Sequence, residues 1–223
     1  MALTKNMSLQ QIKSFLENEL KEQIFLEVAP ILYIGQESGG YFGVTRQILC
    51  LVNFLGALYY GYSPDEKKKK SDIGPSWKAL EFMKNIMSDV DPIYKSKEAE
   101  YFYEMYRHGL IHLYQPKTLK LKGRRKLNWF LYKGGRNSHT ETINDEYGNR
   151  FKIPNVSHLR VLTYSFGGNP NKDFLSISIT CLYKDLLTSI DIFYNKIEKD
   201  KVLLKHWRQT ANAISEPVSY PKA

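Results

Sequence analysis

The spacing of hydrophobic residues changes twice along this chain of 223 residues, and these changes constrain the fold more than any single motif. From residue 8 to residue 113 the apolar residues recur three and four positions apart, as on one face of a helix. Over about 118–182, short β-rich runs alternate with Gly, Asn and Pro, and the helical spacing then returns over 183–209. We therefore predict a single domain, 1–223, of mainly α (α+β) class. It is a helical bundle with a small antiparallel β insertion before the last long helix.

Local signals set the expected limits of the elements. Ser8 and Gln11 have the spacing of a capping box, and Pro30 is expected to end the helix that they begin. The predicted helices are 8–28, 41–60, 76–90, 93–113 and 183–207. The β-rich runs are 127–132, 143–153, 159–166 and 175–181.

Charge and cysteine content narrow the class of protein. The formal net charge of +9 favours polyanionic partners such as nucleic acid, because basic surfaces attract phosphates and release their counterions. Cys50 and Cys181 lie in apolar runs without the spacing of zinc or redox sites, so both are predicted to be buried thiols. The first residues contain no apolar segment typical of a secretory signal. The longest apolar run, Ile48 to Tyr60, falls short of the roughly 20 residues that cross a bilayer. We expect a cytoplasmic protein with no membrane partner.

The fourth predicted helix carries the most informative pair of side chains, Arg107 and His112. A guanidinium can hold a phosphate, and an imidazole can exchange a proton near neutral pH, so together they suit RNA cleavage without a metal. Gly109, between them, costs about 1 kcal/mol in a helix relative to Ala, which suggests a close approach to the backbone. Five helical residues rotate about 140° around the axis, so the two side chains diverge unless the helix loosens near Gly109 or the Arg side chain bends back.

The run from Met105 to Lys117 resembles the signature of the HEPN superfamily, in which Arg is followed by four to six residues, often beginning with a polar one, and then by His. The resemblance implies a compact helical bundle, commonly a homodimer, in which the motifs of two subunits meet in one cleft. Many members are metal-independent endoribonucleases of toxin, antiviral or RNA-processing systems, so an antitoxin or another regulatory protein is an expected partner. The catalytic positions carry over onto Arg107 and His112, and less directly onto His108. The long β insertion departs from a minimal member.

The resemblance implies a division of roles on single-stranded or loop RNA. His112 would act as general base on the ribose 2′-OH or as general acid on the leaving oxygen, and Arg107 would stabilise the charge that develops on the phosphate. A second titrating group would come from His108 or from a partner subunit. No cofactor or metal is expected.

Two other interpretations of the same helix remain open. Glu104, His108 and His112 lie at intervals of four residues and could bind a divalent metal, although three ligands on one straight helix splay over about 12 Å. The Arg and His side chains could instead form a structural hydrogen-bond network in a non-catalytic RNA-binding or interaction module.

The densest basic cluster follows the motif. Basic residues beside aromatic ones can hold a nucleic-acid backbone and stack bases, which makes this cluster a candidate substrate-binding surface. An amphipathic strand with its charges outward would give the same pattern. The basic residues are Lys120, Lys122, Arg124, Arg125 and Lys126, and the aromatic ones are Trp129, Phe130 and Tyr132.

Overall fold

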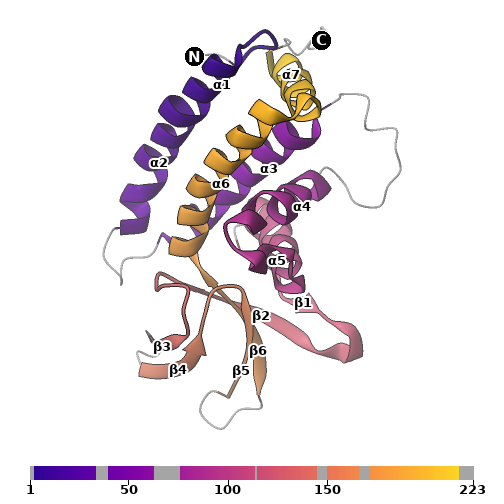
Figure 1. Cartoon of the computed structure of the whole chain (residues 1–223). Helices are drawn as coiled ribbons and strands as arrows, with labels where there is room; N and C mark the ends of the chain where they lie inside the picture. Colours follow the sequence, from indigo (N-terminus) through magenta and orange to yellow (C-terminus); the bar gives the residue numbers. More distant parts are fainter. Residues whose placement is uncertain are drawn as a thin grey trace, which may run out of the picture.

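A computed structural model describes residues 3–33, 40–62, 76–113, 115–144, 150–165 and 171–215; within these ranges the side chains of 76, 108–113, 124, 143 and 144 are not described. Helices form one part of the molecule, and the strands gather at one end of them (Figure 1). The mainly α (α+β) class is therefore confirmed. The helices are α1 Leu9–Ser14, α2 Lys21–Tyr33, α3 Tyr41–Tyr60, α4 Ser76–Asn85, α5 Lys97–Leu113, α6 Ile179–Lys199 and α7 Lys201–Ser215. The strands are β1 Leu119–Lys120, β2 Lys126–Tyr132, β3 His139–Asn144, β4 Arg150–Val156, β5 Arg160–Tyr164 and β6 Lys172–Ser178.

The N-terminal helical segment begins where the sequence predicted, but it ends later. The Gln11 N–H donates to Ser8 Oγ at 3.2 Å, and the Ser8 N–H donates to Gln11 Oε1 at 2.8 Å, so the capping box forms. A π-helical turn, Phe15–Leu20, joins α1 to α2. Pro30 does not end α2, which continues to Tyr33. A proline so close to a helix end removes only one hydrogen bond, and the buried Leu32 still packs inward.

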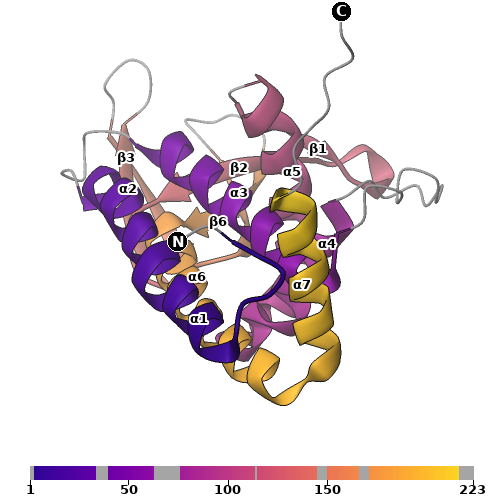
Figure 2. The same cartoon turned by 90° about the horizontal axis from the view of Figure 1, so that it is seen from above.

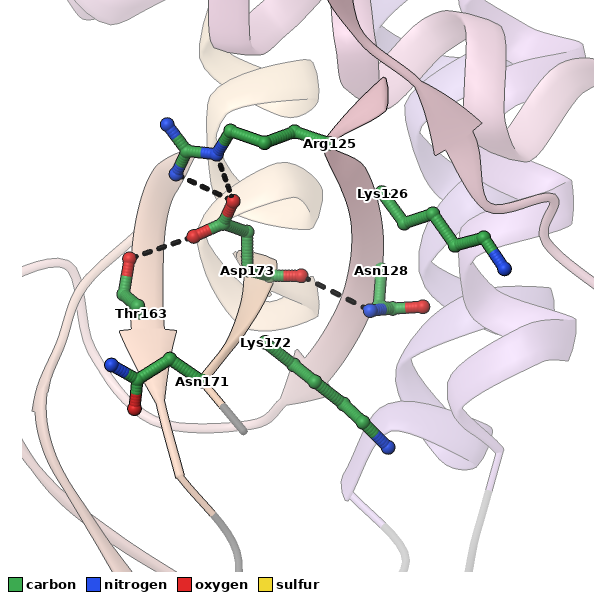
Figure 3. A pocket seen from close by; sticks show the side chains of 7 residues that line it. All are labelled: Arg125, Lys126, Asn128, Thr163, Asn171, Lys172 and Asp173. Atoms are coloured by element: carbon green, nitrogen blue, oxygen red, sulfur yellow. Dashed lines mark hydrogen bonds and ion pairs between the residues drawn. The ribbon is translucent and has the colours of Figure 1, made fainter. Parts of the chain in front are cut away.

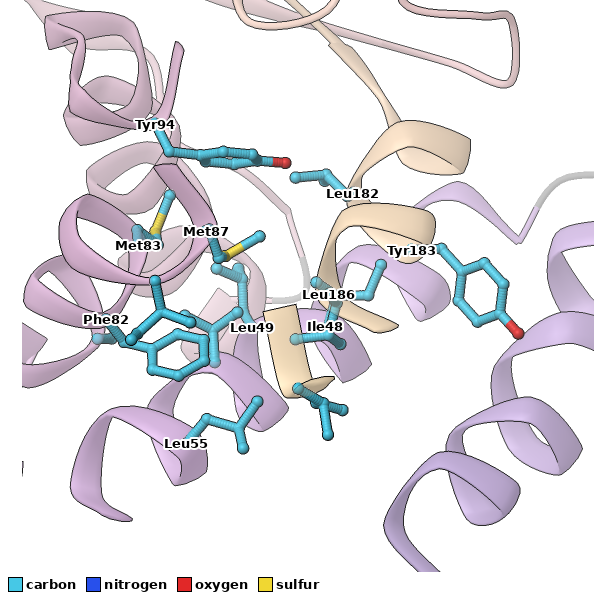
Figure 4. Close-up of a cluster of buried hydrophobic side chains, with 14 of the residues drawn as sticks. Ile48, Leu49, Leu55, Phe82, Met83, Met87, Tyr94, Leu182, Tyr183 and Leu186 are labelled. Carbon is cyan, nitrogen blue, oxygen red and sulfur yellow. The ribbon is translucent and has the colours of Figure 1, made fainter. Parts of the chain in front are cut away.

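Helix α3 occupies the centre of the bundle and contacts α2, α4, α5, α6 and α7 (Figure 2). Its inner residues pack against side chains from α4 and α6, and Figure 4 shows Phe82 and Leu186 beside α3 residues. By length and composition alone α3 could also cross a membrane, but the core helix of a soluble protein passes the same test. Cys50 on α3 is exposed, which contradicts the prediction of a buried thiol, whereas Cys181 on α6 is buried.

The four-stranded sheet has the order β1-β2-β6-β5 and is mixed. β1 with β2 and β5 with β6 are antiparallel, as predicted, but β2 and β6 run parallel. Parallel neighbours need a long crossover, and the separate hairpin of β3 and β4, followed by β5, fills that part of the chain. β6 then leads directly into α6, so the insertion returns the chain to the bundle.

The long C-terminal helix predicted for residues 183–207 is two helices. α6 already begins at Ile179, with Ser178 as its N-cap. Asp200 leaves the helical conformation, and its Oδ1 accepts a hydrogen bond of 2.7 Å from the Val202 N–H at the start of α7. A carboxylate at that position is a favourable N-cap, which explains the break.

Candidate functional site

Helix α5 fixes the position of the Arg and His motif in the fold. Its inner face buries Phe102, Tyr103 and Tyr106 in the main core. Lys84 of α4 donates to Glu100 Oε1 at 2.8 Å, which joins the first turn of α5 to the neighbouring helix. The backbone is α-helical from Lys97 to Leu113, so the helix is not interrupted at Gly109.

Arg107 is half-buried on this helix, next to an aromatic ring. Its guanidinium carbon lies 5.9 Å from the ring centroid of Tyr103, and the Tyr103 hydroxyl donates to Asn53 Oδ1 of α3 at 2.6 Å. Burial raises the pKa of Tyr103 to about 12, with the charge of Arg107 opposing that rise. No acidic side chain among the described residues forms an ion pair with Arg107. Within the described part of the chain, the charge of Arg107 therefore lies beside an aromatic ring and is not paired with a carboxylate.

The two histidines of the motif are placed only by their backbone. His108 and His112 belong to α5, but their imidazoles lie outside the described side chains. The proposed roles of these imidazoles and the alternative metal site with Glu104 therefore fall on atoms that the structure does not describe. Beyond the helix, the Lys117 N–H donates to Met105 O at 2.9 Å, so the chain that leads to β1 stays against α5.

The basic cluster forms a turn at the far end of the sheet. Lys120 on β1 is the direct cross-strand partner of Lys126 on β2, and the Leu121 N–H donates to Arg125 O at 2.8 Å. The side chains of Lys120, Lys122 and Lys126 are exposed, and that of Arg124 is not described. Like charges directly opposite each other on two strands repel, so this turn is more stable when an anion lies beside it.

Two of the predicted binding residues, Arg125 and Lys126, line an open pocket of about 520 Å³ (Figure 3). The parallel pairing of β2 with β6 brings Lys172 and Asp173 into the same pocket. In Figure 3 the side chains of Lys126 and Lys172 point to the same side, whereas Arg125 turns towards Asp173. The other lining residues are Asn128, Thr163 and Asn171.

Asp173 accepts hydrogen bonds from three residues that line this pocket. It is 7% exposed, and its Oδ2 accepts from Arg125 Nε at 2.6 Å. Thr163 Oγ1 donates to its Oδ1 at 2.7 Å, and Asn128 Nδ2 donates to its backbone oxygen at 3.3 Å. One carboxylate thus fixes Arg125, while Lys126 and Lys172 remain exposed beside it. Sequence reasoning missed Lys172, because only the pairing of two strands distant in sequence brings it here.

A second polar cluster, also missed, joins the sheet to the helices. Arg136, between β2 and β3, donates to both carboxylate oxygens of Asp185 on α6, at 2.5 and 2.6 Å, and also pairs with Asp91. Tyr94 donates to Asp185 Oδ2 at 2.7 Å, and its hydroxyl lies 3.2 Å from His158 Nε2. Each of these groups has a partner within the cluster, which indicates a structural joint and not a binding site.

Protonation in this joint follows from burial. The Ser178 N–H donates to His158 Nδ1 at 3.2 Å, so the proton of the neutral ring is on Nε2 and points at Tyr94. Burial, assisted by the charge of Arg136, lowers the pKa of His158 to about 3. Burial and the neighbouring Asp185 carboxylate raise the pKa of Tyr94 well above its usual value.

Comparisons with protein families, with curated proteins and with solved structures gave no match.

Proposed function

We propose that this protein binds single-stranded RNA and cleaves it without a metal, with Arg107 and His112 as the catalytic pair, as the resemblance to the HEPN superfamily implies. The observation that carries the proposal is the state of Arg107: it is a half-buried residue whose guanidinium lies beside the Tyr103 ring, with no carboxylate partner among the described side chains. Such a cation is available for a phosphate, and little side-chain order has to be gained on binding.

The basic turn supports RNA as the substrate. Lys120 lies opposite Lys126, and Lys172 of β6 lines the same pocket as Lys126, so positive charge is concentrated at one end of the sheet. The formal net charge of +9 acts in the same direction. Phosphates would relieve the repulsion between these lysines and release counterions.

Cleavage is tested with the purified full chain and end-labelled single-stranded RNA in EDTA. We expect products that end in a 2′,3′-cyclic phosphate or a 3′-phosphate, and no cleavage of DNA of the same sequence, since the 2′-OH is the nucleophile. Arg107→Ala and His112→Ala should each lower the rate by about 100-fold or more. Arg208→Ala, which removes an exposed arginine from α7, is the matched control and should cut normally.

Binding is measured in the same preparation by salt titration. Lys126→Ala and Lys172→Ala should each reduce the slope of log K against log salt by about 0.7, the value for one single-strand phosphate contact. Lys205→Ala on α7 should leave the slope unchanged. Wild-type protein that binds RNA but never cuts it would favour the non-catalytic RNA-binding module, and intact cleavage by both motif variants would refute the catalytic assignment.

A further inference from the structure

An aromatic hollow lies between the start of α3 and the middle of β2. Its volume is about 530 Å³, and it opens to solvent. Four of its seven lining residues are aromatic and none is acidic; they are Gly40, Tyr41, Phe42, Gly43, Trp129, Phe130 and Leu131. All seven are half-buried, so none of them is closed inside the core. Along β2, Trp129 and Leu131 pack against the main core, whereas the Phe130 ring lies on the opposite face against Tyr132. The rings at the hollow are therefore those of Tyr41, Phe42 and Trp129.

The ring of Trp129 lies between the hollow and helix α5, which carries Arg107. Trp129 makes an edge contact with Phe42 at 5.3 Å between centroids and another with Tyr106 of α5 at 6.5 Å. Tyr106 immediately precedes Arg107. A ligand in the hollow would therefore lie one aromatic layer away from the helix that carries Arg107.

Glycines leave room at one wall of the hollow. A Cβ added to Gly43 would meet no atom within 4 Å, so the space beside its backbone is open. Gly40 adopts a φ of 80°, a conformation that glycine takes without strain at the start of α3. A flat ring can approach the backbone here where larger side chains would block it.

Charge at the rim favours an anionic ligand over a neutral one. The Lys133 ammonium lies 5.3 Å from the Tyr41 ring centroid, and burial lowers its pKa. The Glu141 carboxylate contributes to the raised pKa of Tyr41, and His139 Nε2 lies 2.7 Å from its Oε1. The hydrogen bond to Glu141, assisted by one to the Asn137 backbone, raises the pKa of His139. The Glu141 carboxylate is thus engaged by His139 and is not directed at a ligand in the hollow.

We propose that this hollow binds an unpaired base of single-stranded RNA, with Lys133 beside the phosphate attached to it. The inference rests on the proposed function and adds to it the element of the substrate that is recognised. Aromatic faces stack on any base, and a neighbouring cation supplies the backbone contact, which is the chemistry of single-strand binding sites. An extended peptide would place backbone amides here and would have no need of a cation.

The test compares two probes on the full chain: a labelled oligouridylate with 2′-O-methyl riboses, which cannot be cut, and the same backbone with its bases removed. Wild-type protein should bind the base-containing probe about 10-fold more tightly. Tyr41→Ala and Phe42→Ala should each remove most of that difference, and Tyr41→Phe should keep it. Phe25→Ala, which removes an exposed aromatic ring from α2, is the control and should keep it as well. Using two separate alanine variants keeps the test decisive if one of them unfolds.

The outcomes separate this inference from the proposed function. Equal affinity of the wild-type protein for both probes, or a full difference retained in both folded alanine variants, would overturn the base site even if RNA is cleaved. A Tyr41-dependent preference in a protein that cuts no RNA would support the base site and remove the catalytic assignment. No binding of either probe would overturn both.

Discussion

Tyr103 and Tyr106 lie three residues apart on the buried face of α5, but their hydroxyls are in different states. The Tyr103 hydroxyl donates to Asn53 at 2.6 Å, whereas the Tyr106 hydroxyl has no partner among the described residues. Burying a hydroxyl without a hydrogen bond costs free energy, and losing a formed bond leaves its partner unsatisfied. The same chemical change at these two positions should therefore have opposite effects.

We expect Tyr103→Phe to lower the free energy of unfolding by about 1 kcal/mol, because the amide oxygen of Asn53 loses its donor. Tyr106→Phe should leave that free energy unchanged or raise it. Urea denaturation of the two variants measures both values. Equal losses would mean that the Tyr106 hydroxyl has a partner beyond the described residues.

The Tyr103 ring also matters for the proposed function, because it lies beside the Arg107 guanidinium. Tyr103→Phe keeps the ring under the guanidinium, so it should affect stability more than RNA cleavage. The sequence singled out Arg107 by its spacing from His112. It could not show that an aromatic ring one turn earlier supports the guanidinium, because that contact depends on the rotamers of two side chains.

At the scale of elements, the caps and limits of helices could be predicted from the sequence, whereas the pairing of strands could not. The capping box at Ser8 and the limits of α3 follow from neighbouring residues, and both agree with the structure. The parallel pairing of β2 with β6, which brings Lys172 to Lys126, depends on residues more than forty positions apart. No periodicity within either strand encodes it. The π-helical turn at Phe15–Leu20 likewise lies inside a regular apolar pattern.

The contact between α3 and α4 depends on a glycine. A Cβ on Gly56 would lie 2.6 Å from the backbone oxygen of Lys78 and 2.8 Å from the nitrogen of Ala79. Backbone atoms cannot turn aside as a flexible side chain can. The two helices would have to separate to make room.

We therefore expect Gly56→Ala to lower the free energy of unfolding by about 1–3 kcal/mol through overpacking, although Ala has the higher helix propensity. Gly43→Ala in the same helix meets no atom within 4 Å and should cause no loss. Thermal melts of the two variants provide the comparison. An equally stable Gly56→Ala protein would show that α4 moves away from α3 without cost.

At the scale of the whole molecule, the cluster around Arg136 holds the sheet against the helices. It connects the loop after β2, the turn after β4 and helix α6 through Arg136, His158 and Asp185. The helical and β segments could be predicted from the sequence, because the spacing of hydrophobic residues changes between them. The cluster around Arg136 could not be predicted, because its members are single polar residues in four separate segments.

The buried imidazole of this joint makes stability depend on pH. The pKa of His158 is about 3 in the folded state and about 6.5 when unfolded, so the unfolded chain takes up a proton first as the pH falls. The contribution of the neutral His158 to the free energy of unfolding is therefore fully present above about pH 6.5 and decreases as the pH falls below that value. Between pH 7.5 and pH 5 the decrease is about 2 kcal/mol. His158→Gln cannot titrate. Its unfolding free energy, measured by urea titration at both pH values, should fall by correspondingly less than that of the wild type, and parallel losses would exclude His158 as the cause.

The last whole-molecule question is whether one chain can complete the catalytic site. Because α5 is helical from Arg107 through His112, the two Cα atoms lie about 140° apart around the axis, and one straight helix directs them to different sides. A second copy related by a two-fold axis could supply the missing partner. The proposed homodimer would then pair Arg107 of one protomer with His112 of its partner.

Mixing the inactive Arg107→Ala and His112→Ala proteins, after dissociation and reassembly, tests this arrangement. Random exchange makes about half of the dimers mixed, and each mixed dimer holds one intact site of two, so about a quarter of the wild-type cleavage rate should return. Mass spectrometry of the intact assemblies confirms that mixed dimers form. If mixed dimers form and stay inactive, the site does not combine one Arg and one His from different protomers. Mixing cannot restore a site that needs both residues from one chain, or a site that needs all four residues from two chains.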